Sequence, residues 1–131
     1  MPDHQDRFPV LVVDDDFDVR DAIADVLETE GIPAAFASDG VEALQWLRDN
    51  PSPCLILLDW MMPRCDGATF RERQKSDPEL AHIPVVLLTA DARIDEKMRA
   101  LDVNGFLRKP VDLDRLSSVI RHYCDDRQAA R

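Results

Sequence analysis

Five short apolar runs along the chain predict the strands of a β-sheet. They cover residues 10–13, 34–37, 55–58, 85–88 and 105–107. The runs at 55–58 and 85–88 do not alternate with polar residues, which is typical of strands that helices cover on both faces. Because amphipathic stretches separate the runs, the pattern indicates repeated βα units and a doubly wound parallel sheet, an α/β fold.

The stretches between the strands predict five helices. The first has the clearest helical spacing, the second follows Ser38-Asp39-Gly40, the third is almost wholly polar, and Asp112 caps the fifth. The positions expected to face the core are, helix by helix, Val19, Ala22, Ile23, Val26 and Leu27; Ala43, Leu44 and Leu47; Ala68 and Phe70; Ile94, Met98 and Leu101; and Leu113, Leu116, Ile120 and Tyr123.

Length and composition are those of one globular domain. The chain has 131 residues, 45% of them hydrophobic, and no linker or internal repeat divides it. We expect the domain to span residues 9–124, between tails at 1–8 and 125–131. No apolar run approaches the roughly 20 residues that cross a bilayer. The N-terminus also lacks the apolar core of a signal peptide, so we expect a cytoplasmic protein without membrane contact.

Net charge and cysteine content limit the kinds of partner and site that the domain is expected to have. The formal net charge is −10, so the domain should repel nucleic acid and acidic membrane surfaces. The three cysteines, Cys54, Cys65 and Cys124, form no metal-type pair, and their number is odd. In a reducing compartment we expect three free thiols.

Carboxylates follow directly on two of the predicted strands. Asp14, Asp15 and Asp16 come after the first run, and Asp59 ends the third. Sites in open α/β sheets form at the carboxyl ends of strands, and right-handed crossovers allow these two strands to be neighbours. Clustered carboxylates repel one another unless a cation neutralises them. The pattern therefore predicts a site for Mg²⁺, which prefers oxygen ligands and readily bridges to phosphoryl groups.

The ends of the two remaining strands supply groups suited to phosphoryl transfer. Thr89 offers a hydroxyl after the fourth strand, and Lys109 offers a positive charge after the fifth. Together with a metal ion, these groups can stabilise a phosphoryl group that is transferred to a carboxylate nucleophile, Asp59.

These residues resemble the receiver domains of bacterial response regulators over nearly the whole chain. The matching pieces are Leu11-Val12-Val13-Asp14-Asp15-Asp16, Leu58-Asp59-Trp60-Met61-Met62-Pro63 with Asp66-Gly67, Leu88-Thr89-Ala90, and Gly105-Phe106-Leu107-Arg108-Lys109-Pro110. The resemblance implies the flavodoxin-like strand order 2-1-3-4-5.

The resemblance also implies roles for single residues. Asp59 would be the phosphoacceptor and, with Asp15, a direct Mg²⁺ ligand. Asp14 would act partly through water, and Met61 would offer its backbone carbonyl to the metal.

Further residues would hold the phosphoryl group. Thr89, the backbone N–H of Ala90, and Lys109 would contact its oxygens, and the bond from Lys109 to Pro110 is expected to be cis. Thr89 and Phe106 would move together as a switch, although a plain core position explains Phe106 equally well.

Taken together, the resemblance implies a signalling domain of a two-component phosphorelay rather than an enzyme, one that catalyses only its own phosphorylation and slow autodephosphorylation. A histidine kinase or histidine phosphotransfer protein would be the donor, and an unidentified protein the downstream target. No direct nucleic-acid contact is expected, and the domain would be a monomer or weak homodimer. The segment from Thr89 to Lys109 is about two residues shorter than in typical receivers, which implies a shortened fourth helix or exit loop.

Other functional classes fit less well. Haloacid-dehalogenase phosphatases require a final Thr or Val where Asp14-Asp15-Asp16-Phe17-Asp18 has Asp, and an EF-hand loop requires Gly where Val19 stands. No glycine-rich nucleotide-binding motif is present. The remaining alternative is a receiver fold that binds proteins without phosphorylation, and the complete set of site residues argues against it.

Overall fold

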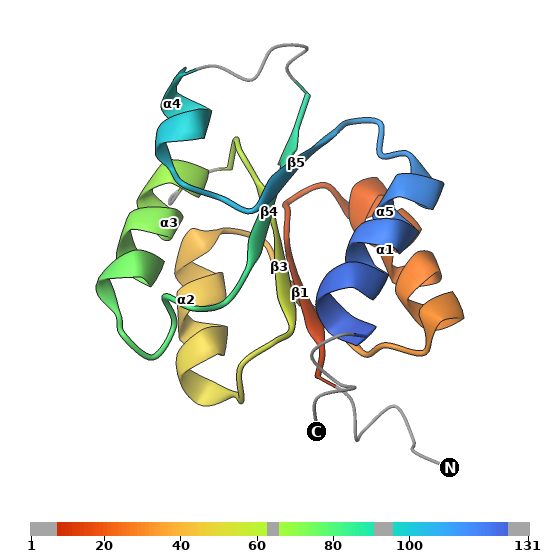
Figure 1. Ribbon diagram of the computed structural model, residues 1–131, viewed down its shortest axis with the longest axis horizontal. Coiled ribbons are helices and arrows are strands. Elements are labelled where there is room, and N and C mark those ends of the chain that lie inside the picture. The colour runs from red at the N-terminus through yellow and green to blue at the C-terminus, as the bar shows by residue number, and fades with distance from the viewer. Residues whose placement is uncertain (1–7, 63–65, 91–95, 126–131) are drawn as a thin grey trace.

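A parallel sheet of five strands forms the centre of the molecule (Figure 1). The computed structural model describes residues 8–62, 66–90 and 96–125. Its strands are β1 (Val10–Val13), β2 (Ala34–Ala37), β3 (Leu55–Asp59), β4 (Val85–Thr89) and β5 (Gly105–Arg108). All pairs are parallel and the order is β2-β1-β3-β4-β5, which confirms the predicted fold class. The last three strands each extend one residue beyond the predicted run.

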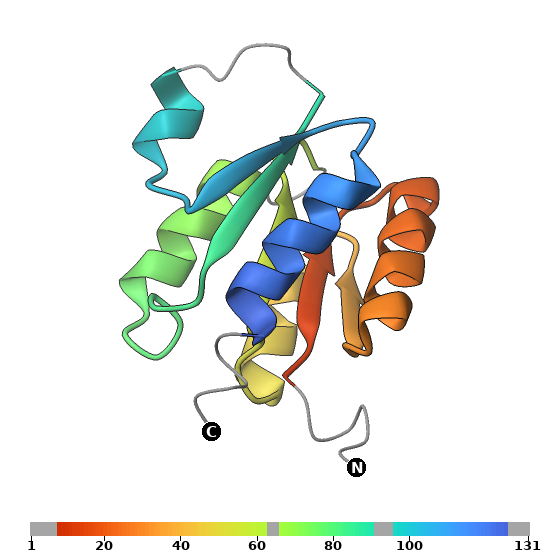
Figure 2. The same cartoon turned by 45° about the vertical axis from the view of Figure 1, so that its right-hand side comes forward.

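Helices cover both faces of the sheet (Figures 1 and 2). Helices α1 (Phe17–Glu30) and α5 (Leu113–Ile120) lie on one face, and α5 continues into a π-helical turn, Arg121–Asp125. Helices α2 (Gly40–Asp49), α3 (Gly67–Ser76) and α4 (Glu96–Ala100) lie on the other side. Aspartate side chains accept hydrogen bonds from the first-turn amides of four helices, which fixes where they begin. These N-cap residues are Asp16, Asp39, Asp66 and Asp112.

Successive strand residues contribute to two separate cores. Val10 and Val12 of β1 pack with α1 and α5, whereas Leu11 and Val13 pack with α2 and α3. Side chains of a strand alternate between the two faces, so a strand covered on both sides must be apolar at every position. This is why β1, β3 and β4 read as continuous apolar runs.

The polar helix α3 is held by buried hydrogen bonds in addition to its one large apolar contact, the fully buried Phe70. Arg71 is only 5% exposed. Its guanidinium donates to the backbone oxygens of Leu101 at 3.2 Å and Asp102 at 2.6 Å, and to Oε1 of Gln74 at 2.8 Å. Gln74 in turn donates to the backbone oxygens of Leu80 and Ile83, each at 3.0 Å. Arg71 therefore ties the exit of α4 to α3.

One expected core position is exposed in the structure, and the fourth helix is described only in part. Leu113, expected in the core, is 48% exposed because it occupies the first position after the N-cap and projects from the surface of α5. Among the described residues, the fourth helical segment is only Glu96–Ala100. Ile94 lies outside the described residues, and Leu101 follows the helix in a turn, where it is partly buried.

The expectation of three free thiols was wrong for two of them. Cys54, which precedes β3, forms a disulfide with Cys124 in the π-helical turn, with Cα atoms 5.2 Å apart. Packing of α5 on the sheet brings together two residues that are 70 positions apart in sequence. Cys65 lies outside the described residues.

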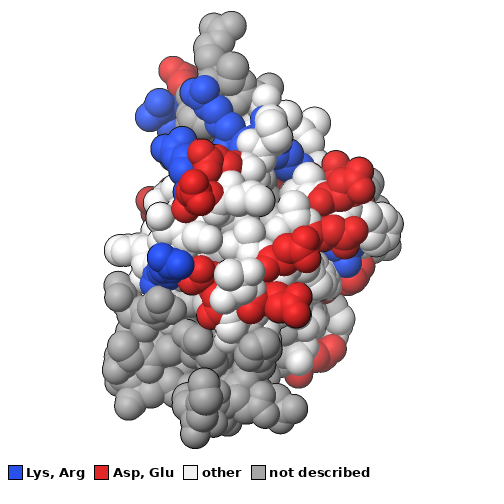
Figure 3. Space-filling view, turned by 90° about the vertical axis from the view of Figure 1, so that its right-hand side faces the viewer, with Lys and Arg blue, Asp and Glu red and all other residues white. Residues whose placement is uncertain are grey.

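Helix character and charge can be compared over the described part of the surface. Of the described helices, none combines the length and apolar character needed to span a bilayer. Acidic side chains outnumber basic ones on the face formed by α1 and α5 (Figure 3). They include the exposed Asp18, Asp21, Asp25, Glu28 and Asp114. Such a surface repels a phosphate backbone.

Candidate functional site

The register of the sheet places two aspartates side by side. Val13 pairs with Leu58, so the next residues, Asp14 and Asp59, leave adjacent strands at the same level. The amide of Asp14 still donates to the oxygen of Ala37 at 3.0 Å, which keeps its backbone in line with β1. Both carboxylates therefore sit at the carboxyl edge of the sheet, where β1 has neighbours on both sides.

A third carboxylate completes a cluster able to hold a cation. Asp14, Asp15 and Asp59 each offer an oxygen, and the three oxygens lie within 4.8 Å of one another. Asp14 is buried, Asp59 is 5% exposed, and Asp15 is exposed and open to incoming ions. Oδ2 of Asp14 accepts no well-aligned hydrogen bond from the described residues. The cluster fits a hard divalent ion such as Mg²⁺, which binds carboxylate oxygens and retains several waters.

Lys109 bridges two of these carboxylates. Its Nζ is 2.8 Å from Oδ2 of Asp14 and 3.3 Å from Oδ1 of Asp59. Its backbone is fixed by a 2.8 Å hydrogen bond from its amide to the oxygen of Thr89, and its bond to Pro110 is cis, as expected. Burial alone would lower the pKa of Lys109, but the contacts with Asp14 and Asp59 outweigh it and raise the pKa. The lysine is therefore a permanent cation at this site.

The loop after β3 is held against the start of α3. The amide of Met61 donates to Oδ1 of Asp59 at 3.3 Å, and the amide of Gly67 donates to the oxygen of Trp60 at 3.3 Å. A Cβ at position 67 would approach the oxygen of Asp59 to 3.0 Å. Glycine therefore permits the close approach of α3 to the Asp59 loop, which a larger residue would have to push apart by a few tenths of an ångström.

A small cavity opens beside Asp59. It has a volume of about 170 Å³ and is lined by Asp59, Trp60, Met61, Thr89, Ala90 and Lys109. Thr89 is 1% exposed, and its pairing with Arg108 sets the end of β4 beside the end of β5. Phe106 is partly buried and packs on the core formed with α2 and α3. The cavity is large enough for a tetrahedral oxyanion and has a carboxylate, a hydroxyl and an ammonium group in its wall.

Burial makes Asp59 an unusually weak acid. Desolvation, with a further contribution from the charge of Asp14, raises the pKa of Asp59 from 3.8 to about 6, although Lys109 opposes the shift. In the absence of a metal ion, the carboxylate is therefore destabilised relative to its solvated form.

This shift predicts that Asp59→Asn stabilises the metal-free protein near neutral pH. The folded state binds the proton of Asp59 more tightly than the unfolded chain, so this residue's contribution to stability falls as pH rises from about 4 to about 6. A two-unit shift corresponds to about 3 kcal/mol, and relaxation of the site should leave about 1–2 kcal/mol. Urea denaturation in chelator should show this advantage at neutral pH and little of it near pH 4. An equal advantage at both pH values would contradict the assignment.

The structure brings together nearly every residue that the sequence singled out. Asp14, Asp15 and Asp59 form the carboxylate cluster, and Thr89, Ala90 and Lys109 line the cavity. Trp60 and Met61 line the cavity as well, although the sequence had suggested Met61 only through its backbone carbonyl. Their position directly after Asp59 was the available signal.

The sequence comparison identifies the family. Residues 10–121 match the response regulator receiver domain. The chain is 35% identical over 114 residues to the DNA-binding dual master transcriptional regulator RpaA of Synechocystis sp., a match that covers 86% of this chain and 47% of that protein. The chain likewise spans about half the length of several other curated relatives that it matches.

Solved structures give the same result at the level of the fold. The phosphorylated cyanobacterial phytochrome response regulator RcpA superimposes with a TM-score of 0.77 at 27% identity, covering 89% of this chain and 94% of that one. The Mn²⁺-bound form of response regulator Rcp1 gives 0.76 at 27% identity with the same coverage. The chain therefore belongs to the response regulator receiver domains, which are signalling domains of two-component systems.

Proposed function

We propose that this domain accepts a phosphoryl group on Asp59 in a Mg²⁺-dependent reaction and thereby switches the binding of a partner protein. The observation that carries the proposal is the arrangement of Asp59 between an acidic cluster and Lys109, beside a cavity lined by Thr89. The phosphorylated RcpA and the Mn²⁺-bound Rcp1 are consistent with the same chemistry here.

Different residues would act as the nucleophile, bind the phosphoryl oxygens and bind Mg²⁺. A carboxylate oxygen of Asp59 forms a bond to phosphorus, and the bond from phosphorus to the donor's histidine nitrogen breaks, with its electron pair leaving on nitrogen. Thr89, the amide of Ala90, and Lys109 hold the phosphoryl oxygens, where negative charge must be balanced. Asp14, Asp15, Asp59 and the carbonyl of Met61 would hold Mg²⁺, which supplies charge neutralisation at the carboxylates and the phosphoryl group.

The switch would couple the acceptor site to the surface of β5. Thr89 would turn toward the new phosphoryl group, and Phe106, two residues before Arg108 on the neighbouring strand, would move inward behind it. The phosphodonor would be a histidine kinase or histidine phosphotransfer protein, and the target a protein. With a net charge of −10, direct DNA binding by this domain is disfavoured, and we place its action in the cytoplasm.

Titration with Mg²⁺ and beryllofluoride tests this proposal through Trp60. Trp60 lines the cavity, so its fluorescence should respond to Mg²⁺ and change further when beryllofluoride is added, whereas Trp46 on α2 supplies a background signal. Trp46→Phe should keep the response, and Asp59→Ala should lose it. A response that persists in Asp59→Ala would instead favour a module that does not use this site.

A further inference from the structure

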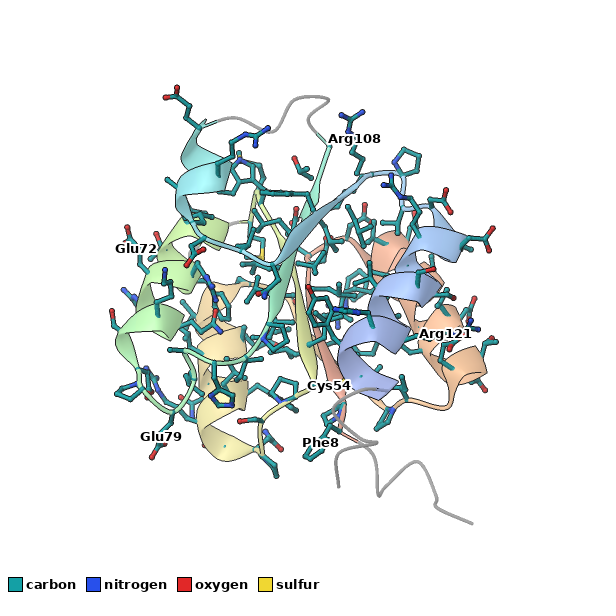
Figure 4. All side chains as sticks on the ribbon, viewed as in Figure 1. Phe8, Cys54, Glu72, Glu79, Arg108 and Arg121 are labelled. Atoms are coloured by element: carbon teal, nitrogen blue, oxygen red, sulfur yellow. A yellow bond between two sulfur atoms is a disulfide. The ribbon has the colours of Figure 1, made fainter. Side chains whose placement is uncertain are left out.

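The disulfide between Cys54 and Cys124 has no role in the proposed phosphoryl transfer. Both residues are fully buried, and their bond joins the base of β3 to the turn that extends α5. Cys54 lies at the edge of the sheet opposite to the acceptor site, close to Phe8 (Figure 4). We propose that this pair is a redox-modification site that cycles between one disulfide and two thiols.

When the disulfide is reduced, the thiol of Cys54 has hydrogen-bond acceptors within reach. Sγ of Cys54 lies 3.5 Å from the backbone oxygens of both Phe8 and Pro9. A disulfide sulfur has no hydrogen to donate, but a thiol at this position can donate to either oxygen. A buried donor without a partner would destabilise the reduced form, and these oxygens remove that cost.

Hydrogen bonds and packing hold the segments around both cysteines in place when the disulfide is reduced. The amide of Cys54 donates to the oxygen of Pro9 at 2.9 Å, which continues the pairing of β1 with β3. On the other side, Arg121 forms two contacts with the carboxylate of Glu30, at 2.7 and 2.9 Å, and Ile120 is fully buried. Reduction therefore removes a covalent link while the packing of α5 remains.

Cys124 is buried, but its position makes it the partner that local opening exposes more readily. It lies in the last described turn of a helix, whereas Cys54 adjoins the buried strand β3. Turns at helix ends open at lower free energy than the interior of a sheet, so a small reagent can reach Cys124 first. Disulfides in the cytoplasm are usually transient, which favours a reversible bond at the location we propose for this domain.

The exchange requires a disulfide co-reactant such as oxidised glutathione. The thiolate of Cys124 attacks one of its sulfurs, forms a mixed disulfide and releases one glutathione thiolate. The thiolate of Cys54 then attacks Sγ of Cys124 and releases the second. The two protein thiols lose two electrons, glutathione disulfide gains them, and the two thiol protons pass to the released thiolates.

Peptide mapping of the whole chain in glutathione buffers tests the proposal. Trypsin cleaves after Arg48, Arg64, Arg71, Arg121 and Arg127, so Cys54, Cys65 and Cys124 fall in separate peptides, 49–64, 65–71 and 122–127. Oxidised buffer should link peptide 49–64 to 122–127, and reduced buffer should return both to alkylated thiols without unfolding the protein. Cys65 should be alkylated in both.

Three results would overturn it. Cys54 and Cys124 could be alkylated in both buffers, remain linked in both, or pair with Cys65 instead.

A second measurement needs no chemical trapping: the oxidised protein should unfold at higher urea concentration than the reduced one, because the bond constrains a long loop of the unfolded chain.

Matched variants separate this proposal from the acceptor function. Cys65→Ser should keep the redox-dependent urea shift, and Cys124→Ser should lose it. Both should retain the Trp60 response to Mg²⁺ and beryllofluoride, because the cysteine pair lies away from the acceptor cavity. Loss of the urea shift in Cys65→Ser would contradict the assignment of the pair, whatever the result at Asp59.

Discussion

Asp59→Asn should abolish labelling of the domain by acetyl phosphate while leaving its fold intact. The expected loss is more than about 100-fold, to background, because an amide lacks the anionic oxygen that attacks phosphorus. Asparagine has nearly the same shape, and its side-chain oxygen can still accept the hydrogen bond that the amide of Met61 now donates to Asp59. The measurement is incorporation of labelled phosphate in the presence of Mg²⁺.

Asp66→Asn is the matched control. Asp66 caps α3 in the same segment that follows β3, and asparagine caps helices as well as aspartate does. This variant should be labelled like the unmodified protein. Undiminished label on Asp59→Asn would show that another residue accepts the phosphoryl group.

Most of the candidate site could be predicted, because each of its residues is recognised by its place at the end of an apolar run. Asp14 follows and Asp59 ends a continuous apolar run, and the pairing of Val13 with Leu58, which the strand order supplies, brings the two together. The same holds for Thr89 and Lys109 at the ends of β4 and β5. Strand ends are thus a reliable guide to a site at the edge of a parallel sheet.

The place of α3 in the chain was predicted, but the way it packs could not be predicted from apolar spacing. Its core-facing residues include Arg71 and Gln74, whose partners are backbone oxygens. A search for apolar residues at helical spacing does not register such contacts. Leu113 shows the opposite error, since an apolar residue at helical spacing is exposed when it occupies the first turn.

The cysteine pair depends on how a helix docks across the sheet. Cys54 and Cys124 meet only because α5 packs on β1 and β3 through the core that contains Leu116 and Ile120. Neither their spacing in sequence nor their number indicated the contact. The N-terminal sequence suggested a reducing compartment, and the expectation of free thiols that followed was wrong for this pair, because the pairing is set by tertiary structure.

Replacing Lys109 with glutamine should slow phosphoryl transfer from acetyl phosphate by about 10²–10³-fold. The Nζ of Lys109 is 3.3 Å from Oδ1 of Asp59, where it can balance the charge of the phosphoryl oxygens. Removing one preorganised donor at a site of developing charge costs about this much in rate. The rate of labelling at saturating Mg²⁺ measures the effect.

Replacing Lys109 should also lower the stability of the fold, and this effect must be distinguished from slower phosphoryl transfer. Without its ammonium group, Asp14 and Asp59 repel each other, which should weaken the metal-free fold and increase its dependence on Mg²⁺. Labelling is therefore compared only where urea denaturation shows the variant fully folded. Lys75→Gln removes an exposed lysine that pairs with Asp102 and should leave the rate unchanged. If Lys109→Gln were folded and labelled within about 3-fold of the unmodified rate, Lys109 would hold the carboxylates in place without stabilising the transferred group.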